Sequence, residues 1–238
     1  MPVAAAPKMK RPAASAKAKA GLGKANLQKA KLEPVRDAER TRRALLDAAE
    51  VEFAAKGLAG ARVDVIAAES SANKRMLYYY FGSKDDLYVA VLDRAYGAMR
   101  EREKDLNLMH LEPLEAIKKL VEFKFDYYEE NPRIIPLLAA ENLQGGKYLK
   151  RSRRLRDMHM SLVDMICTVL EAGERKGVIR PGIDPFQLYV SMSALSYFYF
   201  SNSATLSTAF GRQLASAAEH KERRAHAVEV ITSYVKAQ

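Results

Sequence analysis

Apolar residues recur along this chain at intervals of three and four positions, the spacing that places side chains on one face of an α-helix. Runs of Val, Ile and Thr, which are typical of strands, are scarce. The pattern therefore predicts an all-α fold. The expected helices cover about residues 36–55, 63–69, 74–81, 84–106, 132–144, 147–176, 185–201 and 216–236, and a further helix follows Pro113.

A tight turn separates the two short helices expected over residues 63–69 and 74–81. Asn73 is expected to cap the second helix, because its side chain can accept a hydrogen bond from an unpaired amide of the first turn. Leu77 and Phe81 lie four residues apart and are expected to face the core. Two short helices joined in this way indicate a helix-turn-helix unit.

The second short helix combines two cations with three phenols, namely Lys74, Arg75, Tyr78, Tyr79 and Tyr80. Cationic side chains bind DNA phosphates and guanine edges, and tyrosine hydroxyls bind phosphate oxygens. The competing interpretation, a solvated basic helix in another small bundle, is disfavoured by the tyrosines. The helix is therefore interpreted as one that enters the DNA major groove.

The formal net charge of +10 is concentrated near the N-terminus. Residues 1–35 contain eight basic residues and one acidic residue, a net charge of +7, which leaves +3 for the remainder. Residues 1–33 have almost no large apolar side chain, so we expect a disordered basic arm. This arm is either a solvated tail or a flexible segment that follows DNA phosphates.

Several classes of function are disfavoured by the composition. The single cysteine, Cys167, excludes an intrachain disulfide and a zinc cluster, and its apolar helical surroundings suggest a buried, inert thiol. No apolar run reaches the ~18 residues of a membrane span, and no secretory signal is apparent. The four histidines lack metal-ligand spacing, and no phosphate loop or nucleophile elbow is present. We expect a cytoplasmic protein without catalytic residues, metal or cofactor.

Residues 40–88 resemble the DNA-binding domain of the TetR family of bacterial transcriptional regulators. The shared features, in the same order and spacing, are Ala48-Ala49…Phe53…Gly57, Val63-x-x-Ile66-Ala67 and Leu77-Tyr78-x-x-Phe81-x-x-Lys84-x-x-Leu87. The C-terminal part resembles the branch similar to the pyrimidine-utilisation repressor, through Asn131-Pro132…Leu138-Ala139-Ala140-Glu141-Asn142 and Phe198-Tyr199-Phe200-Ser201-Asn202. The resemblance implies a helix-turn-helix domain over residues 34–82 and an effector-binding and dimerisation domain over residues 83–238.

Carried over position by position, the resemblance implies DNA contacts of two kinds. The candidates for base edges are Lys74, Arg75, Met76 and Tyr79. The candidates for phosphate are Arg40, Arg42, Arg43, Arg62, Tyr78, Tyr80 and Lys84. Two positions depart from the family. Ser71 replaces a glycine, which more readily adopts a positive φ, and Met76 stands where a small hydroxyl residue is common.

The resemblance also implies a homodimer with an effector pocket in each C-terminal domain. Dimerisation would place two reading helices in successive major grooves, and we expect helices 185–201 and 216–236 to form its interface. The effector candidates are aromatic, methionine and polar residues on helices expected to surround a cavity. They are Phe123, Tyr127, Glu141, Asn142, Met158, His159, Met165 and Tyr197, although such residues also fill ordinary cores.

The predicted function is therefore a ligand-responsive transcriptional repressor that leaves a palindromic DNA operator when a small-molecule effector binds. Two alternatives stay open at this point. One is a non-specific architectural DNA-binding protein led by the basic arm, and the other is an all-α enzyme.

Overall fold

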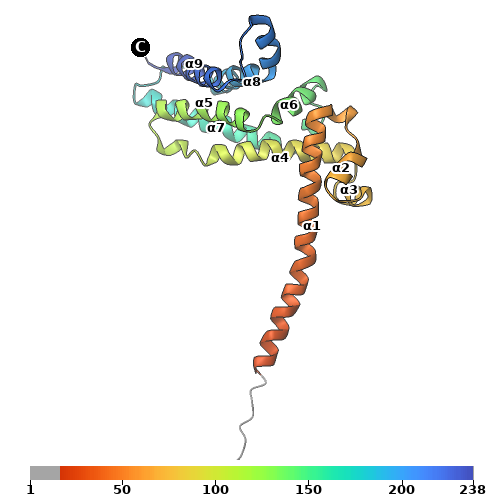
Figure 1. The fold of residues 1–238 in the computed structure, drawn as a ribbon. Coiled ribbons are helices and arrows are strands. Elements are labelled where there is room, and N and C mark those ends of the chain that lie inside the picture. The colour runs from red at the N-terminus through yellow and green to blue at the C-terminus, as the bar shows by residue number, and fades with distance from the viewer. Residues whose placement is uncertain (1–16, 238) are drawn as a thin grey trace, which may run out of the picture. The chain divides into compact units, whose positions relative to one another are not determined.

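A computed structural model describes residues 17–237 of the chain, and the side chains of residues 37–155 and 157–237. Over this range the regular structure is helical, apart from one isolated β-bridge between Ile179 and Lys236. The helices are α1 (Lys17–Gly60), α2 (Val63–Glu69), α3 (Lys74–Phe81), α4 (Lys84–Lys104), α5 (Pro113–Glu130), α6 (Ile134–Leu143), α7 (Arg153–Arg175), α8 (Pro185–Phe210) and α9 (Ala217–Val235) (Figure 1). The predicted all-α fold is confirmed.

The chain divides into two compact units, residues 1–43 and residues 44–238. In the first unit, residues 17–33 are helical, which differs from the disordered arm expected there; residues 1–16 of that arm lie outside the described range. Near its end, Arg40 pairs with Asp37 at 3.1 Å, and the Thr41 hydroxyl donates a 2.8 Å hydrogen bond to the Asp37 carbonyl.

The second unit contains two main hydrophobic clusters. One joins the last turns of α1 to α2, α3 and the first half of α4, where the Phe53 and Tyr88 rings pack edge to face at 5.1 Å. The other lies among α5, α7, α8 and α9, which run side by side in Figure 1. Helix α4 belongs to both regions, because its first half packs with α3 and its second half with α5 and α7.

Several helix ends differ from the sequence-based expectation. Helix α7 begins at Arg153, not near residue 147, because Ser152 caps it and a single 3₁₀ turn, Leu149–Arg151, precedes it. Helix α8 continues nine residues beyond the expected end at residue 201 and stops at Gly211, whose φ is 64°. Within residues 17–237, none of the helices combines the length and apolarity that crossing a membrane requires.

Candidate DNA-binding surface and effector cavity

Helix α3 begins at the predicted cap and is followed directly by a capped α4. The Asn73 side chain accepts a 2.9 Å hydrogen bond from the Met76 amide. After α3, the hydroxyl of Ser83 accepts a 3.0 Å hydrogen bond from the Asp86 amide and caps α4. Leu77 and Phe81 are buried in the cluster with α1, α2 and α4. A short helix held in this way presents its outer face in one orientation.

The turn between α2 and α3 keeps a left-handed residue without glycine. Ser71 has a φ of 54°, and its amide donates a 3.1 Å hydrogen bond to the Ala68 carbonyl. The next amide, that of Ala72, donates to the Ala67 carbonyl at 3.0 Å. A non-glycine residue in this conformation is uncommon and costs free energy. These bonds and the buried α2–α3 contact offset that cost, so the turn forms despite the substitution.

The outward face of α3 carries most of the predicted DNA contacts. Lys74, Arg75 and Tyr79 are exposed, Tyr79 to 79%. Tyr78 is 48% exposed, so half of its surface is covered. Lys74 also forms an ion pair with Asp64 of α2, so its ammonium group has a protein partner on the same surface.

The remaining α3 candidates are more enclosed. Met76 and Tyr80 are half-buried, and the Tyr80 ring packs edge to face on Tyr79 at 5.2 Å. Lys84, in the first turn of α4, is also half-buried. The face therefore combines open cations and one open phenol with a partly covered apolar and phenolic flank.

Arg62 lies at the N-terminus of α2, where its backbone position is fixed by a buried carboxylate. The Arg62 amide donates a 3.0 Å hydrogen bond to Glu52, which also accepts one of 2.9 Å from Lys56. The hydrogen bond from Lys56 is the main reason that the pKa of the Glu52 carboxyl lies below its usual value. The Arg62 side chain is exposed. In the first unit, the side chains of Arg40, Arg42 and Arg43 are exposed as well.

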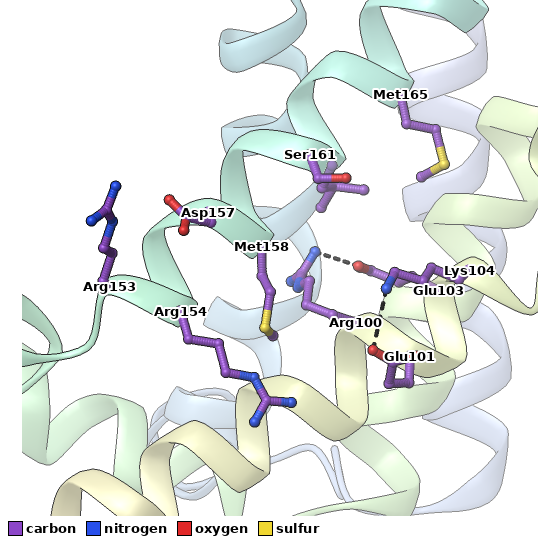
Figure 2. A pocket seen from close by; sticks show the side chains of 11 residues that line it. Arg100, Glu101, Glu103, Lys104, Arg153, Arg154, Asp157, Met158, Ser161 and Met165 are labelled. Atoms are coloured by element: carbon purple, nitrogen blue, oxygen red, sulfur yellow. Dashed lines mark hydrogen bonds and ion pairs between the residues drawn. The ribbon is translucent and has the colours of Figure 1, made fainter.

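A cavity of about 620 Å³ lies between the second half of α4 and the first half of α7 (Figure 2). Its apolar wall is formed by Met158, Leu162 and Met165. Two of these residues, Met158 and Met165, were predicted to contact an effector. The polar lining residues are Arg100, Glu101, Glu103, Lys104, Arg153, Arg154, Asp157 and Ser161.

Buried charges lie at one side of this cavity. Arg100 and Glu103 form an ion pair in Figure 2 and are 4% and 2% exposed. Behind them, Lys124 of α5 is 1% exposed, with its Nζ 3.6 Å from Glu103 and 4.6 Å from the centre of the Tyr189 ring. Burial lowers the pKa of the Lys124 ammonium group, and the Glu103 carboxylate opposes that shift. Two basic groups thus share one carboxylate in an apolar environment.

The other six predicted effector residues do not line this cavity. The Phe123 and Tyr127 rings pack with the Arg102 guanidinium, at 6.0 and 5.4 Å. Tyr197 packs on Tyr128 at 6.0 Å, and Asn142 is exposed. Helical periodicity identified inward-facing positions, but it could not specify which of the helices each position would face.

The last two predicted effector residues, Glu141 and His159, form hydrogen bonds with the backbone. Glu141 is buried and accepts hydrogen bonds from the amides of Tyr148 and Leu149, at 2.8 and 2.9 Å, so it holds the turn before α7. Nδ1 of His159 donates to the Leu155 carbonyl at 2.7 Å, since a carbonyl oxygen can only accept. The prediction of a buried Cys167 thiol was also wrong, because the thiol is half-exposed and lies 3.5 Å from Glu171.

Arg100, Glu103 and Lys124 were not predicted from the sequence, although a signal for two of them is present. Glu103 continues the buried stripe of α4 at the i+4 position after Met99, and Lys124 continues the stripe of α5 at the i+4 position after Leu120. A charged residue on an apolar helix face is expensive to bury. Such a position is therefore a candidate for pairing or for ligand binding.

Family models match both parts of the chain. Residues 45–91 match the model described as bacterial regulatory proteins, tetR family, and residues 113–231 match the tetracyclin repressor-like C-terminal domain. The chain belongs to the TetR family. It is accordingly a DNA-binding transcriptional regulator and not an enzyme, which confirms the predicted class of function and leaves the architectural alternative without support.

Individual relatives agree with this assignment. The HTH-type transcriptional repressor NicS of Pseudomonas putida is 38% identical over 178 residues, which cover 75% of this chain and 84% of NicS. The HTH-type transcriptional regulator RutR of Escherichia coli O157:H7 is 30% identical, over 66% of this chain and 73% of RutR. This similarity confirms the expected likeness to the pyrimidine-utilisation regulator. The crystal structure of a TetR transcriptional regulator from Chloroflexus aurantiacus matches the fold with a TM-score of 0.63, at 21% identity over 85% of this chain and all of that one.

Proposed function

We propose that this TetR-family member is a homodimeric, cytoplasmic repressor that is released from a palindromic operator when a small-molecule effector enters the cavity between α4 and α7. One observation carries the proposal. Helix α4 packs against α3 through its first turns, while Arg100, Glu101, Glu103 and Lys104 near its other end line the cavity. A single rigid element is thus common to the DNA-binding surface and to the cavity.

Three contacts bind the start of α7 to the first half of α4. Arg151 forms an ion pair with Asp86, and the Ser152 hydroxyl donates a 2.5 Å hydrogen bond to Asp93. The Tyr88 ring packs edge to face with a residue of the same turn, Tyr148, at 5.3 Å. A ligand that shifts the first turns of α7 would therefore also displace α4 close to α3.

The mechanism follows from that coupling. The effector binds one arrangement of α4 and α7 more tightly than another and so shifts the population between them. In a dimer, the arrangement favoured by the effector holds the two α3 helices at a separation that does not match the operator. The linkage is reciprocal, so operator DNA weakens effector binding by the same factor.

The proposed DNA contacts follow the residues exposed on and around α3. Arg75 and Tyr79 are the most accessible candidates for base edges, and Lys74 and Met76 flank them. The proposed phosphate contacts are Arg62, Tyr78, Tyr80 and Lys84, together with Arg40, Arg42 and Arg43 of the first unit. Phosphate contacts supply affinity and register, whereas base contacts supply specificity.

The proposed dimer interface uses exposed apolar residues of α8 and α9. On α8 these are Phe186, Val190, Phe198 and Phe210, and on α9 they are Val230 and Tyr234. Other residues of α8 are left out of the proposed interface. Ser196 is fully buried and Tyr197 packs on Tyr128, so these two residues face the interior of their own subunit.

Among the relatives described above, NicS is named as a transcriptional repressor. It supports repression, and not activation, for this chain. A symmetric dimer would read a palindromic operator as two half-sites about 34–36 Å apart.

The test is selection of binding sites from random duplex DNA by the full chain, followed by footprinting and a reporter assay. We expect a compact palindrome with two half-sites about one helical turn, or a small multiple of it, apart. A reporter placed behind the selected site should be repressed by the protein. Uniform protection of all sequences would overturn the operator proposal, and an increase in reporter output would overturn repression.

A further inference from the structure

One buried side chain of the cavity between α4 and α7 carries a positive charge that its neighbours do not fully balance. Among its lining residues, Glu101 and Lys104 pair with each other at 3.2 Å. Arg100 pairs with Glu103, but Glu103 is shared with Lys124, which lies 3.6 Å away. Two cations therefore depend on one anion, and each of the three side chains is at least 96% buried.

The Arg100 guanidinium also has unused hydrogen-bonding capacity. One terminal nitrogen binds Glu103 and the other lies 3.3 Å from the Met99 sulfur, a weak acceptor. Within the part of the chain that the structure describes, no group accepts a hydrogen bond from Nε of Arg100. A guanidinium stays protonated at every physiological pH, so this buried cation cannot remove its charge by losing a proton.

The remaining lining residues indicate which chemical groups a bound anion would have. Arg153 and Arg154 bring two further cations against the single carboxylate of Asp157. The apolar part of the lining is formed by Met158, Leu162 and Met165 of α7, and Met158 lies beside Arg100 in Figure 2. A volume of about 620 Å³ is within the range of small-molecule sites in proteins. The cavity thus combines cationic groups with an apolar surface.

We propose that the effector is an organic anion, a carboxylate on an apolar body, whose carboxylate binds Arg100 while its body packs on Met158, Leu162 and Met165. The inference rests on the proposed function for the identity of the cavity as the effector site. The carboxylate supplies the second anion of the Arg100–Glu103–Lys124 cluster and accepts from the unpaired donor. A neutral molecule of the same shape supplies neither.

The cluster predicts opposite effects for two neutralising substitutions. Arg100→Met removes the proposed ligand partner and leaves Glu103 with Lys124, a balanced pair, so the fold should be retained. Loss of a charge-assisted hydrogen bond should weaken carboxylate binding roughly 10- to 100-fold. Glu103→Gln removes the internal competitor and leaves two cations, so carboxylate binding should tighten by about threefold or more. A purely structural role would not produce opposite signs.

The test uses the full chain without DNA, titrated with benzoate, cinnamate and octanoate, each paired with its neutral carboxamide. Binding is measured as the shift in thermal unfolding midpoint and by calorimetry. At least one carboxylate should raise the midpoint well above its amide, and Arg100→Met should remove that difference. Lys118→Met, the same kind of change at a partly exposed lysine of α5, should leave it unchanged.

Three results would overturn the inference. The first is that no carboxylate binds better than its amide. The second is that the preference survives in Arg100→Met, and the third is that acetate, which lacks an apolar body, gives the same shift as the larger acids. A separate assay measures release of the selected DNA site. Arg100-dependent binding without DNA release would support this inference and contradict the proposed effector function, so the two failures are distinguishable.

Discussion

The Ser152 hydroxyl donates a 2.5 Å hydrogen bond to Asp93 and so joins the start of α7 to the middle of α4. The same oxygen accepts a hydrogen bond from the Leu155 amide at 3.3 Å and caps α7. One side chain therefore serves two structural purposes, the stability of α7 and its attachment to the helix that supports α3. This double use makes Ser152 the position at which the proposed coupling can be tested separately from effector chemistry.

Replacement of Ser152 by alanine should cost about 1 kcal/mol of folding free energy through loss of the cap. Because the bond to Asp93 is lost as well, the first half of α4 should also become more mobile. Hydrogen exchange of the amides in residues 84–93 is the measurement, and we expect faster exchange in the variant.

Ser216→Ala is the matched control. Ser216 caps α9 by accepting from the Glu219 amide at 3.4 Å. The Ser216→Ala substitution should therefore lower the free energy of unfolding by a similar amount and leave hydrogen exchange in α4 unchanged. Equal exchange rates in α4 for the two variants would contradict a mechanical connection through Ser152.

The recognition surface yields a prediction about specificity. Arg75 is exposed at the start of α3, and an arginine bound to guanine contributes ~1–3 kcal/mol of discrimination between bases. Arg75→Ala should therefore reduce the preference for the selected operator over a scrambled duplex by roughly 5- to 150-fold. The unfolding midpoint should be retained, because the side chain is exposed.

Arg175→Ala, at an exposed arginine in the last turn of α7, removes the same charge elsewhere and serves as the control. Fluorescence anisotropy at fixed salt measures both duplexes. Unchanged preference in Arg75→Ala would remove Arg75 from the base-reading set.

The Lys74–Asp64 pair leads to a third prediction. Asp64 competes with DNA phosphate for the Lys74 ammonium group and adds negative charge to the same surface. Asp64→Asn should therefore tighten DNA binding at low salt. It should also increase the magnitude of the salt slope by up to about 0.9, the value for one additional phosphate contact. The dependence of binding on salt concentration is the measurement.

Asp164→Asn makes the same change in net charge at an exposed position of α7. It should have little effect on the slope. If both variants bind DNA alike, the effect belongs to net charge and not to the Lys74–Asp64 pair.

The DNA-binding half was predictable from sequence because its signals are local. Asn73 forms the expected cap, and Leu77 and Phe81 occupy the expected buried face. Each of these contacts spans only a few residues, so spacing determines them. Ser71 is the informative exception, because a left-handed serine is held by backbone bonds that residue preference does not reveal.

The cavity between α4 and α7 was much less predictable because it depends on how separate helices face one another. Methionine residues 158 and 165 share one face of α7, and that face was correctly expected to be internal. Glu103 stands out locally as a charge on the buried stripe of α4, but its place beside the cavity depends on the contact between α4 and α7, which forms only in the folded chain. The contact of Glu141 with the amides of Tyr148 and Leu149 likewise depends on tertiary structure that the spacing of residues does not reveal.

Acid should destabilise the protein through His159. Burial, and secondarily the charges of Arg100 and Lys124, lower the pKa of His159, while its hydrogen bond to the Leu155 carbonyl partly opposes this. In the unfolded chain the pKa is about 6.5. As pH falls below that value, the unfolded state therefore takes up the proton first. The free energy of unfolding should decrease as the pH falls below about 6.5, until the pH passes below the lowered pKa of His159 in the folded state.

Chemical denaturation at pH 7.5, 6.5 and 5.5 measures this effect, with those values set about one pH unit on either side of the unfolded pKa. His159→Gln removes the titrating group, so its stability should fall less than that of the wild type between the two lower pH values. His226→Gln, at an exposed position of α9, controls for loss of a histidine as such. The comparison isolates His159 because the wild type and His159→Gln share every other titrating group. Parallel pH profiles for the wild type and His159→Gln would contradict a lowered pKa of this imidazole in the folded state.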